Sequence, residues 1–156
     1  MWDVSNKEPT VRTASARAFL AMSPDTVAAV LDGQVPKGDP LPVAKVAAVQ
    51  AAKNTPDIIP YCHPLALEHV GVEFQIRDDG IEIATTVKTS GKTGVEMEAL
   101  TAVSVAALTL YDMLKQLDMG MTIERVELLE KRGGKSDFDR SGRLATVVDD
   151  GQGEAP

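Results

Sequence analysis

The sequence contains one cysteine and few aromatic residues, and each shortage excludes a class of structure. Cys62 is the only cysteine among 156 residues, so an internal disulfide and a zinc site built on several thiolates are both excluded. A reducing, cytoplasmic setting suits such a chain. Aromatic residues make up 4% of the chain, so we expect a core of aliphatic side chains that is rich in alanine.

The sequence also lacks the segments that would direct it to a membrane or to nucleic acid. Residues 1–5 show neither the basic nor the apolar stretch of a signal peptide, and we find no apolar run of the ~18–20 residues that a membrane span needs. Basic residues number 16 against 23 acidic ones, a formal net charge of −7, which argues against a general nucleic-acid-binding protein. A pocket can still be locally positive, so a small anionic ligand is not excluded.

The rest of the composition is that of a folded domain. The apolar fraction of 44% and the charged fraction of 25% are ordinary for a globular protein. We predict a single domain over residues 1–148, followed by an acidic flexible tail at residues 149–156 that carries Asp149, Asp150 and Glu154.

Hydrophobic periodicity predicts the order strand, helix, helix, strand, strand, helix, strand. The first helix begins at Ser23-Pro24, a capping hydroxyl followed by proline, and ends before Gly33. The face of the second helix that we expect to be buried consists of Val43, Val46, Ala47, Val49 and Ala51. The predicted strands cover residues 10–20, 68–76, 81–87 and 122–130, and the predicted helices cover residues 24–32, 43–54 and 95–117, with a loop at 89–94 and only loop and tail after Gly133-Gly134.

This order predicts an α+β fold of the ferredoxin-like kind, an antiparallel sheet with helices on one face and one added helix. The long helix contains thirteen successive residues, 99–111, without a charge on any face. A helix that is apolar all round is buried all round. Either the other helices cover its outer side, or another subunit does; we predict an oligomer.

Three loops combine lysine with glycine, at Lys37-Gly38, Gly91-Lys92 and Lys131–Lys135. Such pairs let a backbone and an ammonium group approach an anion closely, although each alone also suits a solvated turn. The middle loop imitates a phosphate-binding loop but is no Walker motif, because Thr86 stands where the first glycine should be.

Two further groups of residues could carry chemistry. Asp112 and Lys115 lie three apart on the long helix, as a surface ion pair or as an acid–base pair in which a lowered lysine pKa makes the lysine a proton donor. His63 is fixed between Pro60 and Pro64, as a structural histidine or a ligand-binding one. Glu98 lies about 21 Å along the helix from Asp112, so one site could use both only at a subunit junction.

Taken together, several strings closely resemble the MoaC family of molybdenum cofactor biosynthesis, over residues 2–136. They are Asp3-Val4-Ser5, Lys37-Gly38-Asp39, Ile58-Ile59-Pro60-Tyr61-Cys62-His63-Pro64-Leu65, Gly91-Lys92-Thr93-Gly94-Val95-Glu96-Met97-Glu98-Ala99-Leu100-Thr101-Ala102, Leu108-Thr109-Leu110-Tyr111-Asp112-Met113 and Gly133-Gly134-Lys135-Ser136. The resemblance implies a lyase that converts 3′,8-cyclo-7,8-dihydroguanosine 5′-triphosphate to cyclic pyranopterin monophosphate and pyrophosphate. It also implies a homohexamer, a trimer of dimers, with sites at the dimer interface.

The resemblance further implies the roles of individual residues. By matched motif, the catalytic residues are Asp112, Lys115 and Lys37, and the substrate-binding residues are Tyr61, Cys62, His63, Met97, Glu98, Arg12, Lys53, Lys131 and Lys135. No metal site and no cofactor is required, although Mg²⁺ with the phosphates is compatible. This sequence departs from the family pattern at Tyr61, Pro40, Arg132 and Asp137, and those departures bear on the shape of the pocket. A nucleotide-sensing module without catalysis, or a plain interaction module, are the alternatives.

Overall fold

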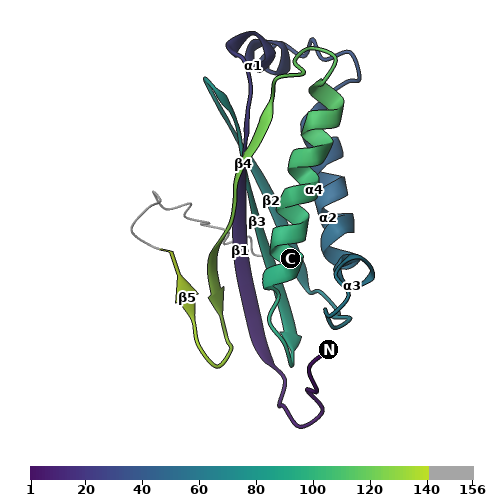
Figure 1. Ribbon diagram of the computed structural model, residues 1–156, viewed down its shortest axis with the longest axis vertical. Coiled ribbons are helices and arrows are strands. Elements are labelled where there is room, and N and C mark those ends of the chain that lie inside the picture. Colours follow the sequence, from purple (N-terminus) through teal and green to yellow (C-terminus); the bar gives the residue numbers. More distant parts are fainter. Residues whose placement is uncertain (141–156) are drawn as a thin grey trace, which may run out of the picture.

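The frame of the molecule is an antiparallel sheet of five strands in the order β2-β3-β1-β4-β5 (Figure 1). The structure is a computed structural model, and it describes residues 1–140. The strands are β1 (Thr10–Ala21), β2 (His69–Arg77), β3 (Gly80–Gly91), β4 (Thr122–Arg132) and β5 (Phe138–Asp139). The predicted ferredoxin-like α+β class is confirmed. The predicted tail at residues 149–156 lies outside the described residues.

Helices cover one face of this sheet. They are α1 (Pro24–Leu31), α2 (Pro40–Lys53), the single-turn α3 (Thr55–Ile58) and α4 (Glu96–Leu114). Figure 1 shows α2 and α4 side by side along the sheet, with α1 at one end and α3 at the other. The predicted arrangement, helices on one face with one added helix, is therefore present, and α3 adds one further turn.

Capping residues fix where the first two helices begin. The Ser23 hydroxyl accepts a hydrogen bond from the amide of Thr26 at 3.3 Å, with Pro24 in the first turn, as predicted. Asp39 caps α2 in the same way by accepting from the amide of Leu41 at 3.1 Å. The second helix therefore begins at Pro40, three residues before the predicted start, because an Asp-Pro pair supplies both a cap and a fixed first φ angle.

Alanine fills the core, as the shortage of aromatic residues predicts. Completely buried alanines come from β1, α2 and α4, and include Ala14, Ala16, Ala44, Ala48, Ala99, Ala102, Ala106 and Ala107. The predicted buried face of α2 is correct for Ala51, which is buried, and for Val49, which packs against the core, but it is wrong for Val43 and Val46, which are exposed, Val46 by 66%. Close packing of α2 on α4 selects the smallest side chains for the contact, so an alanine row lies inside and these two valines lie outside.

Several predicted element ends are also wrong by a few residues. β3 continues to Gly91, which pairs with Thr10, instead of giving way to a loop at residue 89. α4 ends at Leu114, three residues early, because the amides of Leu117 and Asp118 both turn back to the Leu114 carbonyl oxygen. β4 extends to Arg132 and forms a hairpin with β5, in a region where only loop and tail were expected.

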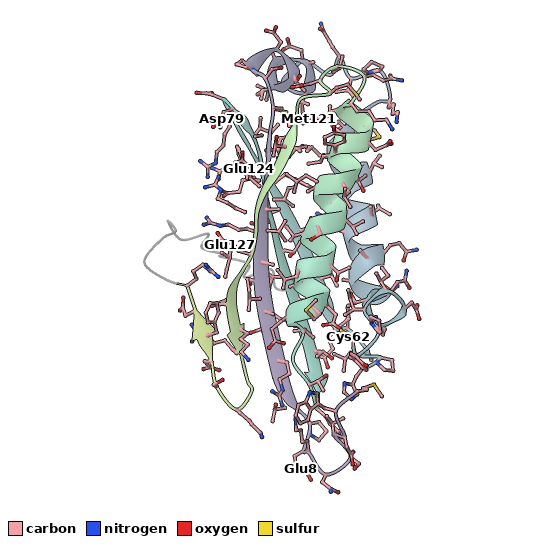
Figure 2. The ribbon with its side chains drawn as sticks, in the orientation of Figure 1. Glu8, Cys62, Asp79, Met121, Glu124 and Glu127 are labelled. Carbon is pink, nitrogen blue, oxygen red and sulfur yellow. The ribbon has the colours of Figure 1, made fainter. Side chains whose placement is uncertain are left out.

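The register of the sheet brings two of the lysine–glycine loops together. β3 and β4 both run antiparallel to β1, and both end beside its beginning, where Thr10 pairs with Gly91 and Thr13 pairs with Arg132. The loop at 92–95 and the turn at 133–137 therefore lie at the same end of the sheet. The N-terminal segment is at that end too, where Figure 2 labels Glu8.

Candidate functional site

At one end of α4, two lysines share one carboxylate. Lys37, in the loop before α2, places Nζ 2.8 Å from Oδ2 of Asp112 and also donates to the Asp112 backbone carbonyl at 2.9 Å. Lys115, the residue after the helix, places Nζ 2.7 Å from the other oxygen, Oδ1. We call Lys37, Asp112 and Lys115 the Asp112 cluster. The structure thus brings together the three residues expected to be catalytic, from positions 75 residues apart.

The charges of the Asp112 cluster stabilise one another. Hydrogen bonds from Lys115 and then Lys37 lower the pKa of Asp112 to about 2, so the carboxylate is ionised throughout the physiological range. The hydrogen bond with Asp112 raises the pKa of Lys115. Of the two interpretations of Asp112 and Lys115, the ion pair is therefore present and the lowered lysine pKa is not found in the protomer, because a paired carboxylate outweighs the small desolvation of an exposed lysine.

At the other end of α4 lies a hollow of about 320 Å³ with several basic side chains in its wall. We call it the cationic hollow. Arg12 comes from β1, Lys131 from β4 and Lys135 from the turn after β4. Lys92 comes from the loop before α4, and Lys7 from the N-terminal segment. Tyr61 and His63 complete the wall on the side of the proline-bounded loop. Convergent cations of this kind suit a polyanionic ligand.

A second hollow of about 330 Å³ adjoins the first. Tyr61, His63, Thr93, Gly94 and Glu96 line both of them, and Cys62, Met97 and Glu98 line the second alone. We call it the Glu98 hollow. Figure 2 places Cys62 beside this end of α4. The two hollows together gather eight of the nine residues expected to bind substrate.

Glu98 gives its hollow an unusual carboxyl group. Its side chain belongs to the buried core, with 3% of the residue exposed. Burial raises its pKa, with a smaller contribution from the charge of Glu96, against the hydrogen bond from its own amide. Burial, followed by the charge of Glu98, also raises the pKa of the Cys62 thiol. Cys62 is therefore a poor nucleophile, since the thiolate is the reactive form.

The two glutamates in the first turn of α4 have different environments, since one forms an ion pair and the other is buried. Glu96 forms an ion pair with Lys131 at 3.1 Å, which neutralises the carboxylate nearest to the cationic hollow. The sequence alone suggests that both glutamates would repel a phosphate. In the structure, one is paired and the other is buried, so the hollow keeps its positive wall.

The sequence did not identify every residue that lines the cationic hollow. Trp2, Lys7 and Lys92 line the cationic hollow without having been assigned to it. The signal for Lys92 was available, because an antiparallel β3-β1-β4 arrangement requires the loops that carry Lys92 and Lys131 to meet. No sequence pattern predicted that Trp2 lies in this wall, because the first residues show no periodicity that would place it.

Two expected groups do not join these hollows within one protomer. Lys53, the last residue of α2, is exposed and lines neither hollow. The Asp112 cluster is fourteen residues from Glu98 along α4, about 21 Å at 1.5 Å per residue. A single protomer therefore carries the Asp112 cluster and the two hollows at opposite ends of one helix.

Within residues 1–140, no group of three or more His, Cys, Asp or Glu side chains is placed to hold a metal ion. By length and composition alone, α4 could cross a bilayer, a possibility that a search for an unbroken apolar run overlooks. More than half of it is buried in the domain, and the core helix of a folded protein passes the same test.

Comparison with known proteins gives one consistent result. A family model described as the MoaC family matches residues 1–134. A protein of Novosphingobium aromaticivorans named cyclic pyranopterin monophosphate synthase is 56% identical over 136 residues, 87% of each chain. Proteins of the same name from Peptoclostridium acidaminophilum and Geotalea uraniireducens are 52% and 54% identical, over 90% and 87% of this chain and 90% and 86% of their own. The chain belongs to the MoaC family.

Proposed function

We propose that this protein is a cyclic pyranopterin monophosphate synthase, a lyase that converts 3′,8-cyclo-7,8-dihydroguanosine 5′-triphosphate to cyclic pyranopterin monophosphate and pyrophosphate. The observation that carries the proposal is the Asp112 cluster, in which Lys37 and Lys115 each take one oxygen of the same carboxylate. Relatives more than 50% identical to this chain over most of its length bear the name of this enzyme.

The cationic hollow supplies what the triphosphate needs. In the last step, a hydroxyl of the substrate gives up its proton to solvent and its oxygen attacks the α-phosphorus. The new O–P bond closes the cyclic phosphate, the bond to the β-phosphate oxygen breaks, and pyrophosphate carries away the electron pair. Charge grows on the phosphate oxygens during this displacement, so positioned cations lower the barrier. Arg12, Lys131 and Lys135 are the groups that we expect to provide them, with Lys92 and Lys7 beside them.

The Asp112 cluster supplies proton transfer in this scheme. A raised pKa keeps Lys115 protonated at neutral pH, so it enters the reaction as an acid or as a positive charge, not as a base. Asp112 stays ionised and holds both ammonium groups in place. At the other end of α4, Glu98 and His63 would hold the base and sugar portion of the substrate by hydrogen bonds.

One substrate can reach both half-sites, the Asp112 cluster and the two hollows, only if two protomers share it, so we propose that the active site lies between subunits. Val105 is midway between Glu98 and Asp112, and a twofold axis there would set the Glu98 end of one α4 against the Asp112 cluster of its partner. The outer face of α4 suits such a contact, since Leu108 is 58% exposed while Thr101 and Ser104 are small. The homohexamer, a trimer of dimers, is the assembly expected from the family.

Mixing impaired variants tests the shared site. Lys115→Ala damages one half-site and Lys131→Ala the other, so at a substrate concentration well below the wild-type KM each protein alone should show about a tenth of the wild-type rate or less. After the two are unfolded and refolded together, random pairing should restore about a quarter of the sites, because half of the dimers are mixed and one of their two sites is intact. A mixture that is no more active than the separate variants, although mass measurements show mixed oligomers, would place each site within one subunit.

Product formation tests the function itself. We expect wild-type protein to release pyrophosphate and form the cyclic product without a redox cofactor, and Mg²⁺ can accompany the phosphates. We retain the expectations of a cytoplasmic enzyme and of a protein that binds neither nucleic acid nor membrane. Tight binding of the triphosphate without pyrophosphate release would favour the nucleotide-sensing alternative instead.

A further inference from the structure

Two large aromatic side chains are exposed side by side in the wall of the cationic hollow. Trp2 is 88% exposed and Tyr61 is 77% exposed, and both line this hollow as well as a neighbouring one of about 450 Å³. Within residues 1–140, the exposed large aromatic side chains are Trp2, Tyr61 and Phe138, so two of the three lie together at this hollow. Exposed apolar surface beside convergent charges is typical of a ligand-binding site.

The backbone on either side of Trp2 is held in place while its indole is free. Nε2 of His63 donates to the carbonyl oxygen of Trp2 at 2.9 Å. The amide and hydroxyl of Ser5 donate to Oδ1 of Asp3 at 2.9 and 2.7 Å. Nζ of Lys92 donates to the carbonyl oxygen of Ser5 at 2.9 Å. The two residues that tie down this segment, His63 and Lys92, also line the hollow, so the segment forms part of its wall.

We propose that Trp2 binds the purine-derived ring system of the substrate by stacking, with Tyr61 beside it. This inference rests on the proposed function, because it takes the substrate to be a purine-derived triphosphate. The phosphates would lie on Arg12, Lys131 and Lys135, and the ring would lie across the indole. Stacking of a heterocycle on an aromatic side chain strengthens binding by about tenfold or more.

Kinetics of two substitutions at Trp2 decide the proposal. Trp2→Leu removes the aromatic face but keeps an apolar side chain, and we expect KM to rise about tenfold with little change in kcat. Trp2→Phe keeps a face that can stack and should restore most of the loss. A merely structural role for Trp2 would lower kcat or stability and would not separate Leu from Phe. A Trp2→Leu enzyme with the wild-type KM overturns the proposal.

The composition also offers a direct signal. Trp2 is the only tryptophan in the chain, so fluorescence excited at long wavelength reports on this one indole. We expect GTP, used as a stable probe, to quench the wild-type emission saturably. Inorganic triphosphate should displace GTP and restore the emission without quenching it. GTP that competes with inorganic triphosphate for the site, yet leaves the emission unchanged, contradicts stacking.

The proposed enzymatic function and the stacking role of Trp2 can fail separately. If the wild-type protein forms no cyclic product but GTP quenches its emission saturably, the proposed function is wrong and a purine-binding role for Trp2 remains. An active enzyme whose KM is the same with leucine at position 2 would do the reverse.

Discussion

The two ends of α4 hold their charges in opposite ways. At the Asp112 cluster, the three charged groups are bonded to one another, and the Asp112 side chain remains 56% exposed. At the other end, Glu98 is buried, and within residues 1–140 neither Arg12 nor Lys135 forms an ion pair with a carboxylate. At one end the charged groups are bonded to one another, and at the other two cations have no carboxylate partner among the described residues.

This difference indicates a division of labour along one helix. In the Asp112 cluster the carboxylate already offsets one of the two ammonium charges, so the cluster gains less from binding a polyanion than unpaired cations would, and we expect it to act in the reaction step. The wall of the cationic hollow holds more cations than carboxylates, and Arg12 and Lys135 form no ion pair among the described residues, so a polyanion relieves their repulsion and we expect this wall to act in binding. Substitutions at the Asp112 cluster should therefore change kcat, and substitutions in the cationic hollow should change KM.

The largest effect is expected from Asp112→Asn. The substitution removes the shared negative charge, so Lys37 and Lys115 repel each other and lose their positions. We expect kcat to fall by about 10²-fold or more, with a small change in KM and in thermal stability, measured by product formation and by thermal unfolding.

Asp118→Asn is the matched control for that variant. Asp118 lies six residues further on and accepts hydrogen bonds from the amides of Ser23 and Gly120 at 2.9 and 2.8 Å. Its loss should cost about 1 kcal/mol of stability and leave kcat unchanged. An Asp112→Asn protein that is unstable but fully active would reverse the roles assigned to the two carboxylates.

The next largest effect is expected from Lys131→Ala, on KM. Removal of one cation from the hollow costs a charge-assisted contact to phosphate, so KM should rise about tenfold or more while kcat changes little. The dependence of KM on salt should also become weaker, since one fewer charge is screened. Lys45→Ala, on the exposed side of α2, is the control and should show neither change. A fall in kcat with unchanged KM would remove Lys131 from the binding surface.

Alanine substitutions at glycines in two of the lysine–glycine loops, one at each end of α4, should cost different amounts of stability. Gly38 and Gly133 both have positive φ angles, +93° and +86°. An added Cβ at Gly38 has no atom within 4 Å, whereas at Gly133 it would collide with the carbonyl oxygen of Val11. Gly38→Ala should therefore cost about 1–2 kcal/mol of backbone strain, and Gly133→Ala at least about 1 kcal/mol more, by denaturant unfolding. Gly133→Ala should also raise KM, because Lys131 and Lys135 flank the shifted turn. Equal losses of stability would show that the turn can move away.

The sequence was sufficient where a pattern acts locally. Alternation gave β2 and β3, and Ser23-Pro24 gave the start of α1, because caps and strand periods depend on neighbouring residues. The pattern failed for α2, where the choice between an alanine face and a valine face depends on how closely α4 approaches. It also failed for β5, a strand of two residues that exists only because β4 is beside it.

The same distinction between local patterns and long-range packing applies to the candidate site. Motif strings identified Lys37 and Asp112 separately, but their meeting depends on where the loop before α2 lies relative to the end of α4. Glu98 and Cys62 line the same hollow because of where the loop that carries Cys62 lies, and periodicity does not contain that information. The wrong direction for the pKa of Lys115 has the same origin, since the sequence names the neighbour three residues away and not how fully it is bonded.

The smallest effect is expected from Glu98→Gln, and it concerns stability and pH. Burial raises the pKa of Glu98 in the folded protein, so the unfolded chain releases its proton at a lower pH than the folded one. Stability is therefore lost as pH rises through that interval, and it stays lower by a constant amount above the folded pKa. Glutamine has nearly the same shape and no such penalty, so the variant should gain stability relative to wild type as pH rises from 4 to 7, while activity falls. Glu96→Gln, two residues earlier in the same helical turn, removes the ion pair with Lys131 and should show no such gain in stability. A stability difference between Glu98→Gln and wild type that is the same at both pH values would mean that Glu98 is hydrated in solution, and the contrast between the two ends of α4 would then rest on the unneutralised cations alone.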